Sequence, residues 1–263
     1  MKNKVTAIVN QKGGIGKTTT ALNLGYALSE EGKKVLLIDF DPQASLTASV
    51  GINADNKTNI YTLMANSIEE KETGENYIVN IKNNLDIIPS TLDLAGIEMT
   101  LVNVMSRETI LKSIIDEIKK DYDYVLIDCS PSLGTLTINA LAACDSVIIP
   151  VTPEYLSAKG LGLLVKNINL IKKRINPNIV IDGILITMLN KRTNLSKEMV
   201  KAINESTRYI KNQYDLDIKV FENKIPISVK AGEAMLYKQS VIQYDPKNQV
   251  AGAYKEFARE WVI

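Results

Sequence analysis

The sequence predicts an α/β fold in which a predominantly parallel sheet carries helices on both faces. Short, continuously apolar segments alternate along the chain with segments of helical spacing. Strands that are buried on both faces have this continuous apolar character, and parallel sheets are built from them. In addition, the first apolar segment leads through a glycine-rich loop directly into the first helical segment.

Six segments are expected to be strands, because they are short, rich in Val, Ile and Leu, and bounded by polar or turn-forming residues. They are residues 4–10, 34–40, 85–89, 124–128, 146–151 and 179–189. Six further segments repeat apolar residues at three- and four-residue intervals and are expected to be helices. They are residues 18–31, 107–120, 133–144, 158–174, 196–209 and 246–261.

The chain is expected to form a single domain over residues 1–263, because no Pro/Gly/Ser-rich linker and no internal repeat divides it. Residues 53–84 are more polar, with Glu69, Glu70, Glu72 and Glu75 close together, and are expected to form a surface excursion. The first strand starts near Val5, so we expect neither a leader nor a DNA-recognition domain ahead of it.

The composition restricts the compartment and the chemistry. No apolar run approaches the roughly 18 residues of a membrane span, and Cys129 and Cys144 lie in apolar stretches typical of core positions in a reducing cytoplasm. Histidine is absent, which excludes Ser-His-Asp triads and histidine zinc sites. Phosphoryl transfer suits the remaining carboxylates, lysines and amides, because it depends mainly on positioning and charge neutralisation.

Residues 12–19 form a phosphate-binding motif between the first strand and the first helix. They are Lys12, Gly13, Gly14, Ile15, Gly16, Lys17, Thr18 and Thr19. Glycines allow backbone N–H groups to turn toward an anion, Lys17 supplies a charge for the β- and γ-phosphates, and Thr18 supplies a hydroxyl ligand for Mg²⁺. The common pattern has glycine where this chain has Gln11. The motif predicts P-loop NTPase architecture with ATP and Mg²⁺ as cofactors.

Carboxylates follow two of the predicted strands. Asp39 and Asp41 end the strand at 34–40, and Asp128 ends the strand at 124–128. Open α/β sheets gather their ligands at the carboxyl ends of the strands. Carboxylates beside bound phosphates would repel them, so these positions imply a magnesium ion between the two.

With these motifs assembled, the sequence resembles the ParA/Soj-type partitioning ATPases, in the ParA/MinD superfamily with its deviant Walker A loop. Four segments carry the resemblance: NQKGGIGKTTTALNLGYAL, VLLIDFDPQASLT, YDYVLIDCSPSLGTLTINAL and VIIPVTPEYLSAKGL. Residues 229–234 are similar to a C-terminal signature of the group, but Lys238 stands where a glycine is expected.

The resemblance implies a role for each site residue. Lys12 becomes the signature lysine, which crosses an ATP-sandwich homodimer to the partner subunit's phosphates, and Lys17 and Asp41 complete the catalytic set, with Asp41 helping to place the attacking water. Thr18, Asp39 and Asp128 surround Mg²⁺, with Asp128 as the Walker B acid. Asn190 and Pro226 fall near the adenine.

Positive charge collects in the C-terminal half. Residues 155–240 contain 15 Lys and Arg against 7 Asp and Glu, a net charge of +8, while the remainder carries −7. At about 100° per residue, the basic side chains of the helix at 196–209 and its extension share one face. They are Lys197, Lys201, Arg208 and Lys211, opposite the apolar Leu195, Met199, Ala202, Ile203 and Ile210.

Lys191 and Arg192 precede this helix, at a position where the family carries a DNA-contacting arginine. We therefore expect non-specific binding of double-stranded DNA, driven by phosphate contacts. The resemblance further implies a ParB-like partner that stimulates hydrolysis, a cytoplasmic and nucleoid-associated location, and partition of plasmid or chromosome cargo. The cargo itself is not encoded in the motifs.

Three other functions share part of this pattern. A MinD-like membrane-cycling ATPase would need a basic amphipathic C-terminal helix, whereas here Lys255 and Arg259 are matched by acidic neighbours and the apolar stripe at 250–261 predicts a docked helix. An iron–sulfur ATPase would need cysteines in a suitable motif. A non-hydrolysing binder would be expected to lack Lys17, Asp41 or Asp128.

Overall fold

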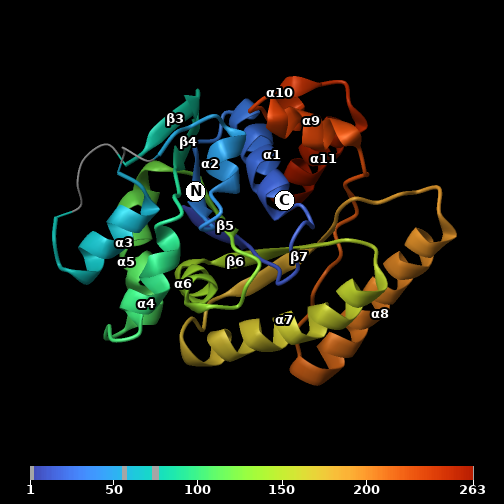
Figure 1. Ribbon diagram of the computed structural model, residues 1–263. Helices are drawn as coiled ribbons and strands as arrows, with labels where there is room; N and C mark the ends of the chain where they lie inside the picture. The colour runs from blue at the N-terminus through green and yellow to red at the C-terminus, as the bar shows by residue number, and fades with distance from the viewer. Residues whose placement is uncertain (1–2, 55–57, 73–76, 263) are drawn as a thin grey trace.

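The structure, a computed structural model, describes residues 3–54, 58–72 and 77–262, apart from the side chains of residues 155–159. Within these residues seven strands form one sheet in the order β3-β4-β2-β5-β1-β6-β7. Every neighbouring pair is parallel except β3 and β4, which are antiparallel. The predicted, predominantly parallel sheet is therefore confirmed (Figure 1).

The strands lie close to where they were predicted, with β3 as the addition. Their bounds are β1 Lys4–Ile8, β2 Val35–Phe40, β3 Val79–Lys82, β4 Leu85–Ile88, β5 Tyr124–Cys129, β6 Ser146–Val151 and β7 Val180–Ile186. The main difference is in β7, which ends at Ile186 where the sequence predicted a strand to residue 189. Met188 follows it in a left-handed conformation, with φ of 52°, which does not continue a strand.

The six predicted helices are all present. The α-helices are α1 Lys17–Glu30, α2 Ser45–Ser49, α3 Ile60–Ile68, α4 Leu94–Leu101, α5 Ile110–Ile118, α6 Thr135–Ala143, α7 Tyr155–Arg174, α8 Asn194–Tyr214, α9 Val229–Leu236, α10 Val241–Tyr244 and α11 Gln249–Val262. Two short 3₁₀ turns, Arg107–Thr109 and Lys119–Asp121, flank α5 and complete the helix predicted at 107–120.

The expectation of a surface excursion over residues 53–84 is wrong for part of that segment. Ile60, Leu63 and Met64 of α3 are buried in the core, and β3 pairs with β4 at the sheet edge. The helix starts at the Asn59 side chain, which accepts a hydrogen bond from the Thr62 amide, a common N-terminal cap. Residues 55–57 and 73–76, including Glu75, lie outside the described residues.

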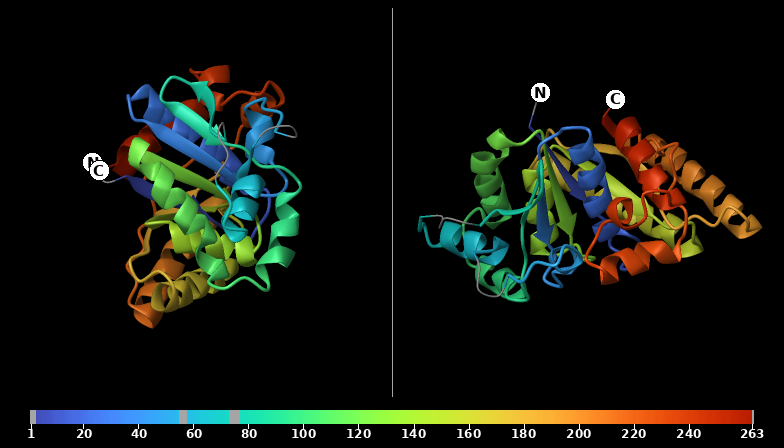
Figure 2. Two further views of the ribbon diagram at one scale, coloured as in Figure 1. Left: turned by 90° about the vertical axis from the view of Figure 1, so that its left-hand side faces the viewer. Right: turned by 90° about the horizontal axis from the view of Figure 1, so that it is seen from above.

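The helices form two layers, one on each face of the sheet (Figure 2). Alternate residues of each strand enter opposite cores, because side chains alternate across a strand. Val5 and Ala7 of β1 join the core under α3, α4, α5, α6 and α7. Ile8 joins the other core, under α1, α10 and α11. Burial on both faces explains why the predicted strands are continuously apolar.

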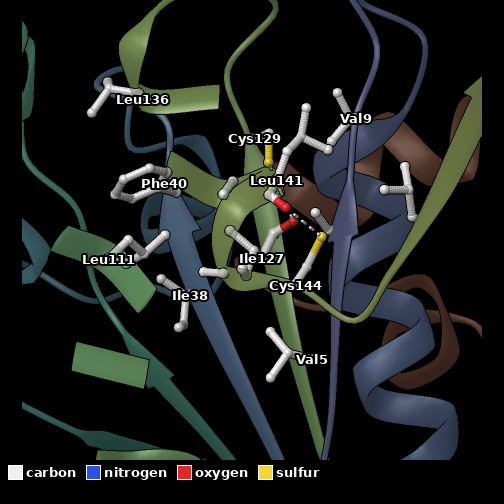
Figure 3. Packing of buried hydrophobic residues seen from close by; sticks show 14 of the residues in the cluster. Val5, Val9, Ile38, Phe40, Leu111, Ile127, Cys129, Leu136, Leu141 and Cys144 are labelled. Carbon is white, nitrogen blue, oxygen red and sulfur yellow. Dashed lines mark hydrogen bonds between the residues drawn. The ribbon is translucent and has the colours of Figure 1, made fainter. Parts of the chain in front are cut away.

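Both cysteines lie in the first of these cores (Figure 3). Cys129 and Cys144 are each about 2% exposed or less, among residues such as Ile127, Leu141 and Val5. Burial raises the pKa of both thiols. Their prediction as small core residues is confirmed, and neither is placed at a surface where two subunits could share a cluster.

The C-terminal helix α11 is docked rather than free. Val250, Tyr254, Phe257 and Trp261 are buried against α1 and its neighbours, as the apolar stripe predicts. Its polar side is tied to α1 by the ion pair of Lys255 with Glu30. Among the described residues, no helix combines the length and the apolar character needed to cross a membrane.

Candidate nucleotide and magnesium site

The predicted site residues meet at the carboxyl edge of the sheet. Strands β2 and β5 are in register so that Asp39 lies directly beside Asp128, and Ile8 at the end of β1 pairs with Asp128 from the other side. The loop at 12–16 therefore leaves the sheet next to both carboxylates. This juxtaposition follows from the parallel topology, because all three strands end at the same edge.

The loop at 12–16 is held in a fixed shape by its glycines and by one long-range contact. Gly14 and Gly16 have φ values of 70° and 86°, which favour glycine because a Cβ would be strained there. The Thr187 hydroxyl, from the end of β7, donates to the Ile15 carbonyl over 2.8 Å. Gly16 then precedes the first turn of α1, whose N-terminal amides and dipole favour an anion.

Lys17 points back across this loop. Its ammonium donates to the Lys12 carbonyl over 3.1 Å, and the residue is only 7% exposed. Burial lowers the pKa of Lys17, while the carboxylates of Asp128 and Asp41 oppose that shift. A partly desolvated cation at the start of a helix, held within the loop, is suited to bind phosphate.

Asp128 is a deeply buried carboxylate. It is 0% exposed, and neither of its oxygens has a hydrogen bond of ordinary geometry within the described residues, although the Thr18 side chain is near enough to interact with the carboxylate. Burial raises the pKa of Asp128 well above its ordinary value, the Asp39 carboxylate raises it further, and Thr18 and Lys17 oppose the shift. Leaving such a group unsatisfied is costly, and a cation brought by a nucleotide would offset this cost.

The residues fit magnesium better than a metal held by protein groups alone. No group of three or more His, Cys, Asp or Glu side chains within the described ranges is arranged to bind a metal. Magnesium needs fewer protein ligands, because it keeps several waters and is bound through one or two carboxylates together with substrate phosphates. Thr18, in the first turn of α1, and Asp128 are the groups that match this requirement.

Asp39 and Asp41 are tied into a hydrogen-bonded network. The Asp39 carboxylate accepts from the Thr47 amide and hydroxyl over 2.8 and 2.7 Å, and from the Asp41 amide over 3.3 Å. Ser90, after β4, donates its hydroxyl to the Asp41 carbonyl over 2.9 Å. Burial raises the pKa of Asp39 to about 6. The network fixes the backbone that carries Asp41 and uses the oxygens of Asp39 to do so.

An apolar cavity of 210 Å³ opens beside the loop. Pro226, Met188, Ala231, Met235 and Tyr254 line it together with Gly16 and Thr19 of the loop. An apolar pocket next to a phosphate loop suits the flat face of a nucleotide base. A larger open hollow, of 770 Å³ around Lys4 and Tyr124, lies at the opposite, amino end of the strands and includes no loop residue.

The predicted adenine residues fall on two sides of this region. Pro226 lines the apolar cavity, and it also borders a separate polar cavity of 310 Å³ that contains Asn190. The Asn190 side chain accepts a hydrogen bond from the Arg192 amide over 3.1 Å. Pro226 therefore lies beside the loop, whereas Asn190 lines only the separate polar cavity.

Comparison with known proteins agrees with this geometry. A family model described as an AAA domain matches residues 3–181. The sporulation initiation inhibitor protein Soj of Bacillus subtilis is 42% identical over 258 residues, which cover 98% of this chain and 97% of Soj. The chain belongs to the ParA/Soj family of partitioning ATPases.

Two solved structures extend the comparison from sequence to the site. Cobyrinic acid a,c-diamide synthase from Mycobacterium smegmatis, with an ATP analogue and magnesium bound, is 32% identical with a TM-score of 0.78, over 97% of this chain and 93% of the other. A plasmid partition protein from Borrelia burgdorferi bound to AMPPNP is 27% identical with a TM-score of 0.74, over 98% of each chain. Both are structures of nucleotide-bound proteins with the architecture described above.

Lys12, which the resemblance implied to be the signature lysine, lies at the edge of this site. Lys12 extends away from Lys17, and its ammonium donates to the Glu154 carboxylate over 2.5 Å. Its backbone amide donates to the Asn10 side chain over 3.1 Å, and Asn10 in turn donates to the Pro150 carbonyl at the end of β6. The role of Lys12 across a subunit interface stays a prediction.

The basic residues predicted for DNA lie apart from the nucleotide loop, on α8 and the turn before it. Lys191, Arg192, Lys197, Lys201, Arg208 and Lys211 are all exposed. The predicted apolar side of α8 is only partly correct. Ile203 and Ile210 are buried against the core, but Leu195, in the first turn of α8, is 63% exposed.

Several residues around the site are absent from the predicted set. Thr187 fixes the loop, Thr47 and Ser90 fix the Asp41 backbone, and Glu154 binds Lys12. Thr187, Ser90 and Glu154 lie 172, 49 and 142 positions from their partners, whereas Thr47 lies only eight residues from Asp39. Glu154 stands within the VIIPVTPEYLSAKGL segment that carries the family resemblance, which is the one signal that pointed to its neighbourhood.

Proposed function

We propose that this protein is a Mg²⁺-dependent ATP hydrolase that forms an ATP-sandwich homodimer, binds DNA without sequence preference, and moves DNA cargo with a ParB-like partner. Membership of the ParA/Soj family supports the partitioning role. The observation that carries the nucleotide chemistry is Asp128, fully buried and without a partner, beside Lys17 and Thr18 at the carboxyl edge of the sheet.

Each residue of the site then has a chemical task. The amides of the loop at 12–16 and the Lys17 ammonium bind the β- and γ-phosphates. Thr18 and Asp128 hold Mg²⁺, which neutralises phosphate charge when it is bound. Asp41 orients the attacking water. Asp39 supports Asp41 through Thr47 and the Asp41 amide, which gives it a task at the edge of the magnesium shell.

Calorimetry tests the nucleotide site directly. Replacing Lys17 with Ala removes the buried cation at the phosphates, so Mg·ATP binding should be lost while the fold persists. A circular dichroism melt of both proteins controls for folding. Equal Mg·ATP affinity in the wild type and in Lys17→Ala would contradict the assignment of the loop.

The DNA-binding part of the proposal is supported by the exposed basic face of α8. Lys197, Lys201 and Arg208 form no ion pair with any residue that the structure describes, whereas Lys211 pairs with Asp217 over 3.1 Å. Three unpaired cations on one helix, with Arg192 in the preceding turn, are available for phosphates. Binding through phosphates is independent of sequence and sensitive to salt.

The ATP state should strengthen DNA binding, because a dimer presents two such faces. If each subunit neutralises about three phosphates, the dimer makes about six contacts, and each contributes about −0.9 to the slope. A plot of the logarithm of the binding constant against the logarithm of the salt concentration should then have a slope near −5. Fluorescence anisotropy on two unrelated duplexes across a salt series, with ATP and with ADP, measures this. Nucleoid association in the cell would follow from the same contacts.

Charge-reversal variants test whether DNA binds to the basic face of α8 or to another surface. Arg192→Glu, or Lys197→Glu combined with Lys201→Glu, should weaken binding to both duplexes alike and reduce the slope. Lys120→Glu is the matched control, since Lys120 is an exposed lysine in the 3₁₀ turn that leads into the central strand β5, outside α8 and the turn before it. Binding that ignores the nucleotide, or that survives the reversals with an unchanged slope, would show that α8 is an ordinary solvated surface.

A MinD-like membrane cycle has less support, because the apolar stripe of α11 is already occupied by the protein's own core. The described part of α11 exposes mainly charged and small residues, with Lys255 and Arg259 paired to glutamates. Flotation with anionic liposomes is the direct test. Protein that floats with liposomes in the presence of ATP would favour the membrane cycle over the DNA cycle.

A further inference from the structure

Lys12 has a partner in its own chain. Its ammonium donates to Glu154 over 2.5 Å, and the Lys12 carbonyl accepts the Lys17 ammonium over 3.1 Å. The Lys12 side chain is 38% exposed and the Glu154 side chain 60% exposed. Both side chains therefore lie at the surface, where another molecule can reach the pair.

The backbone brings these two residues together from distant elements. Asn10 links the end of β6 to the loop, because its side chain donates to the Pro150 carbonyl over 2.7 Å and accepts from the Lys12 amide over 3.1 Å. Glu154 follows β6 after a tight turn in which its amide donates to the Thr152 carbonyl, and it directly precedes α7. The pair is therefore held at both ends by the sheet.

Glu154 carries its negative charge at neutral pH. The hydrogen bond from Lys12 lowers the pKa of Glu154, so the carboxylate stays ionised. If Lys12 reaches phosphates of another subunit, as the proposed function has it, its ammonium has to draw away from the Glu154 carboxylate that it contacts here. The cis contact and the trans contact of Lys12 are therefore in competition.

We propose that Glu154 is a positioning residue that holds the Lys12 side chain within its own subunit until the ATP-bound dimer forms. The inference rests on the proposed function, in which Lys12 acts across the dimer. Glu154 then sets how readily ATP-bound monomers associate. It contacts neither nucleotide nor metal in this account, and it acts only through Lys12.

The size of the effect follows from the exposure of the pair. A partly exposed ion pair changes an equilibrium constant by a factor of about 1.5 to 5, and salt screens the attraction. A dimer opens two such pairs, one in each subunit. Removing the Glu154 charge should therefore tighten the ATP-dependent dimer by roughly fivefold at low salt, and the difference should shrink at high salt.

The experiment measures the dimer dissociation constant by light scattering with Mg·ATP, at low and high salt. Glu154→Gln keeps the shape of the side chain and removes its charge. Glu154→Asp keeps the charge and should remain closer to the wild type than to Glu154→Gln. Glu117→Gln on α5 is the matched control, since Glu117 is an exposed glutamate in an unrelated position. ATP affinity of the monomers should be the same in all four proteins.

Glu154→Gln in a Lys12→Ala background tests whether Glu154 acts through Lys12. If Glu154 acts through Lys12, Glu154→Gln changes nothing once Lys12 is absent. An equal gain in both backgrounds, or a Glu154→Gln protein that dimerises no more tightly than the wild type, would overturn the proposal while leaving the dimer itself intact. A wild-type protein that does not dimerise with Mg·ATP would overturn the proposed function, and the positioning role with it.

Discussion

Asp128 provides the sharpest test of how the site is built. Its carboxylate is fully buried, has no hydrogen-bond partner among the described residues, and lies beside Asp39 on the neighbouring strand. An arrangement of this kind costs stability when no cation is bound. Replacing Asp128 with Asn keeps the volume and removes the charge. We expect the nucleotide-free variant to be more stable than the wild type.

The expected change in stability follows from the groups around Asp128. An unsatisfied buried group costs about 1–3 kcal/mol, and more when it is charged; the Asn amide keeps the polar part of this cost and removes the part due to charge and to repulsion by Asp39. The variant also loses the attraction between Asp128 and Lys17, which reduces the gain, so we expect about 1–2 kcal/mol. For a chain of this size that raises Tm by roughly 2–8 °C. When Mg·ATP is present at about 100 times its Kd, binding stabilises the wild type by about 2.7 kcal/mol. The variant is stabilised little by Mg·ATP. The wild type should therefore be the more stable of the two proteins with Mg·ATP and the less stable without it.

Differential scanning calorimetry with and without Mg·ATP measures both effects. Asp182 supplies the matched control, because this carboxylate is nearly buried but accepts hydrogen bonds from Lys4, Ser146 and Trp261 over 2.7 to 2.8 Å. Asp182→Asn should destabilise the protein equally in both conditions. An Asp128→Asn protein that melts below the wild type without nucleotide, or that gains as much from Mg·ATP, would refute the reasoning.

Three further predictions follow from the same structure. Asp41→Ala should reduce ATP hydrolysis by at least about 100-fold while Mg·ATP binding in calorimetry persists; a parallel loss of binding would contradict the water-positioning role. Because burial raises the pKa of Asp39 to about 6 and that of Asp128 as well, the nucleotide-free fold holds more protons than the unfolded chain above about pH 4. Its free energy of unfolding should therefore fall as pH rises through about 6, and less steeply in Asp128→Asn, as thermal melts at several pH values will show. Lys238 has φ of 58°, so Lys238→Gly should raise stability by up to about 1 kcal/mol, whereas Lys230→Gly, within α9, should lower it; a destabilised Lys238→Gly protein would contradict this strain argument.

The parallel sheet was predictable because burial on both faces leaves a strong mark in the sequence. The strand predicted at 34–40 and observed at Val35–Phe40 is an example, since all six of its residues are buried. The shorter helices left a weaker mark. Helix α2 has only five residues, too few to repeat an apolar position. Helix α4 has eight residues with Leu94, Ile97 and Leu101 at helical spacing, a signal that could have predicted it despite Gly96.

Lys238 shows where a departure in sequence becomes intelligible in the structure. The family resemblance implied a glycine there, and the residue adopts the left-handed conformation that glycine favours. The departure therefore concerns the local backbone. The Lys12–Glu154 contact was not predictable in this way, because it joins residues 142 positions apart.

The two aspartates at the strand ends show what sequence alone could not separate. Asp39 and Asp128 end similar apolar strands, and both were assigned to the magnesium shell. In the structure they lie side by side but differ in their partners, since Asp39 accepts three hydrogen bonds from Thr47 and the Asp41 amide, whereas Asp128 accepts none. A carboxylate whose oxygens are already used stabilises the fold around it, and one whose oxygens are left free at the same depth is available to a ligand. From these hydrogen-bond partners we expect Asp39 to support Asp41 and Asp128 to meet the cation, although the pattern that precedes them in the chain is nearly the same.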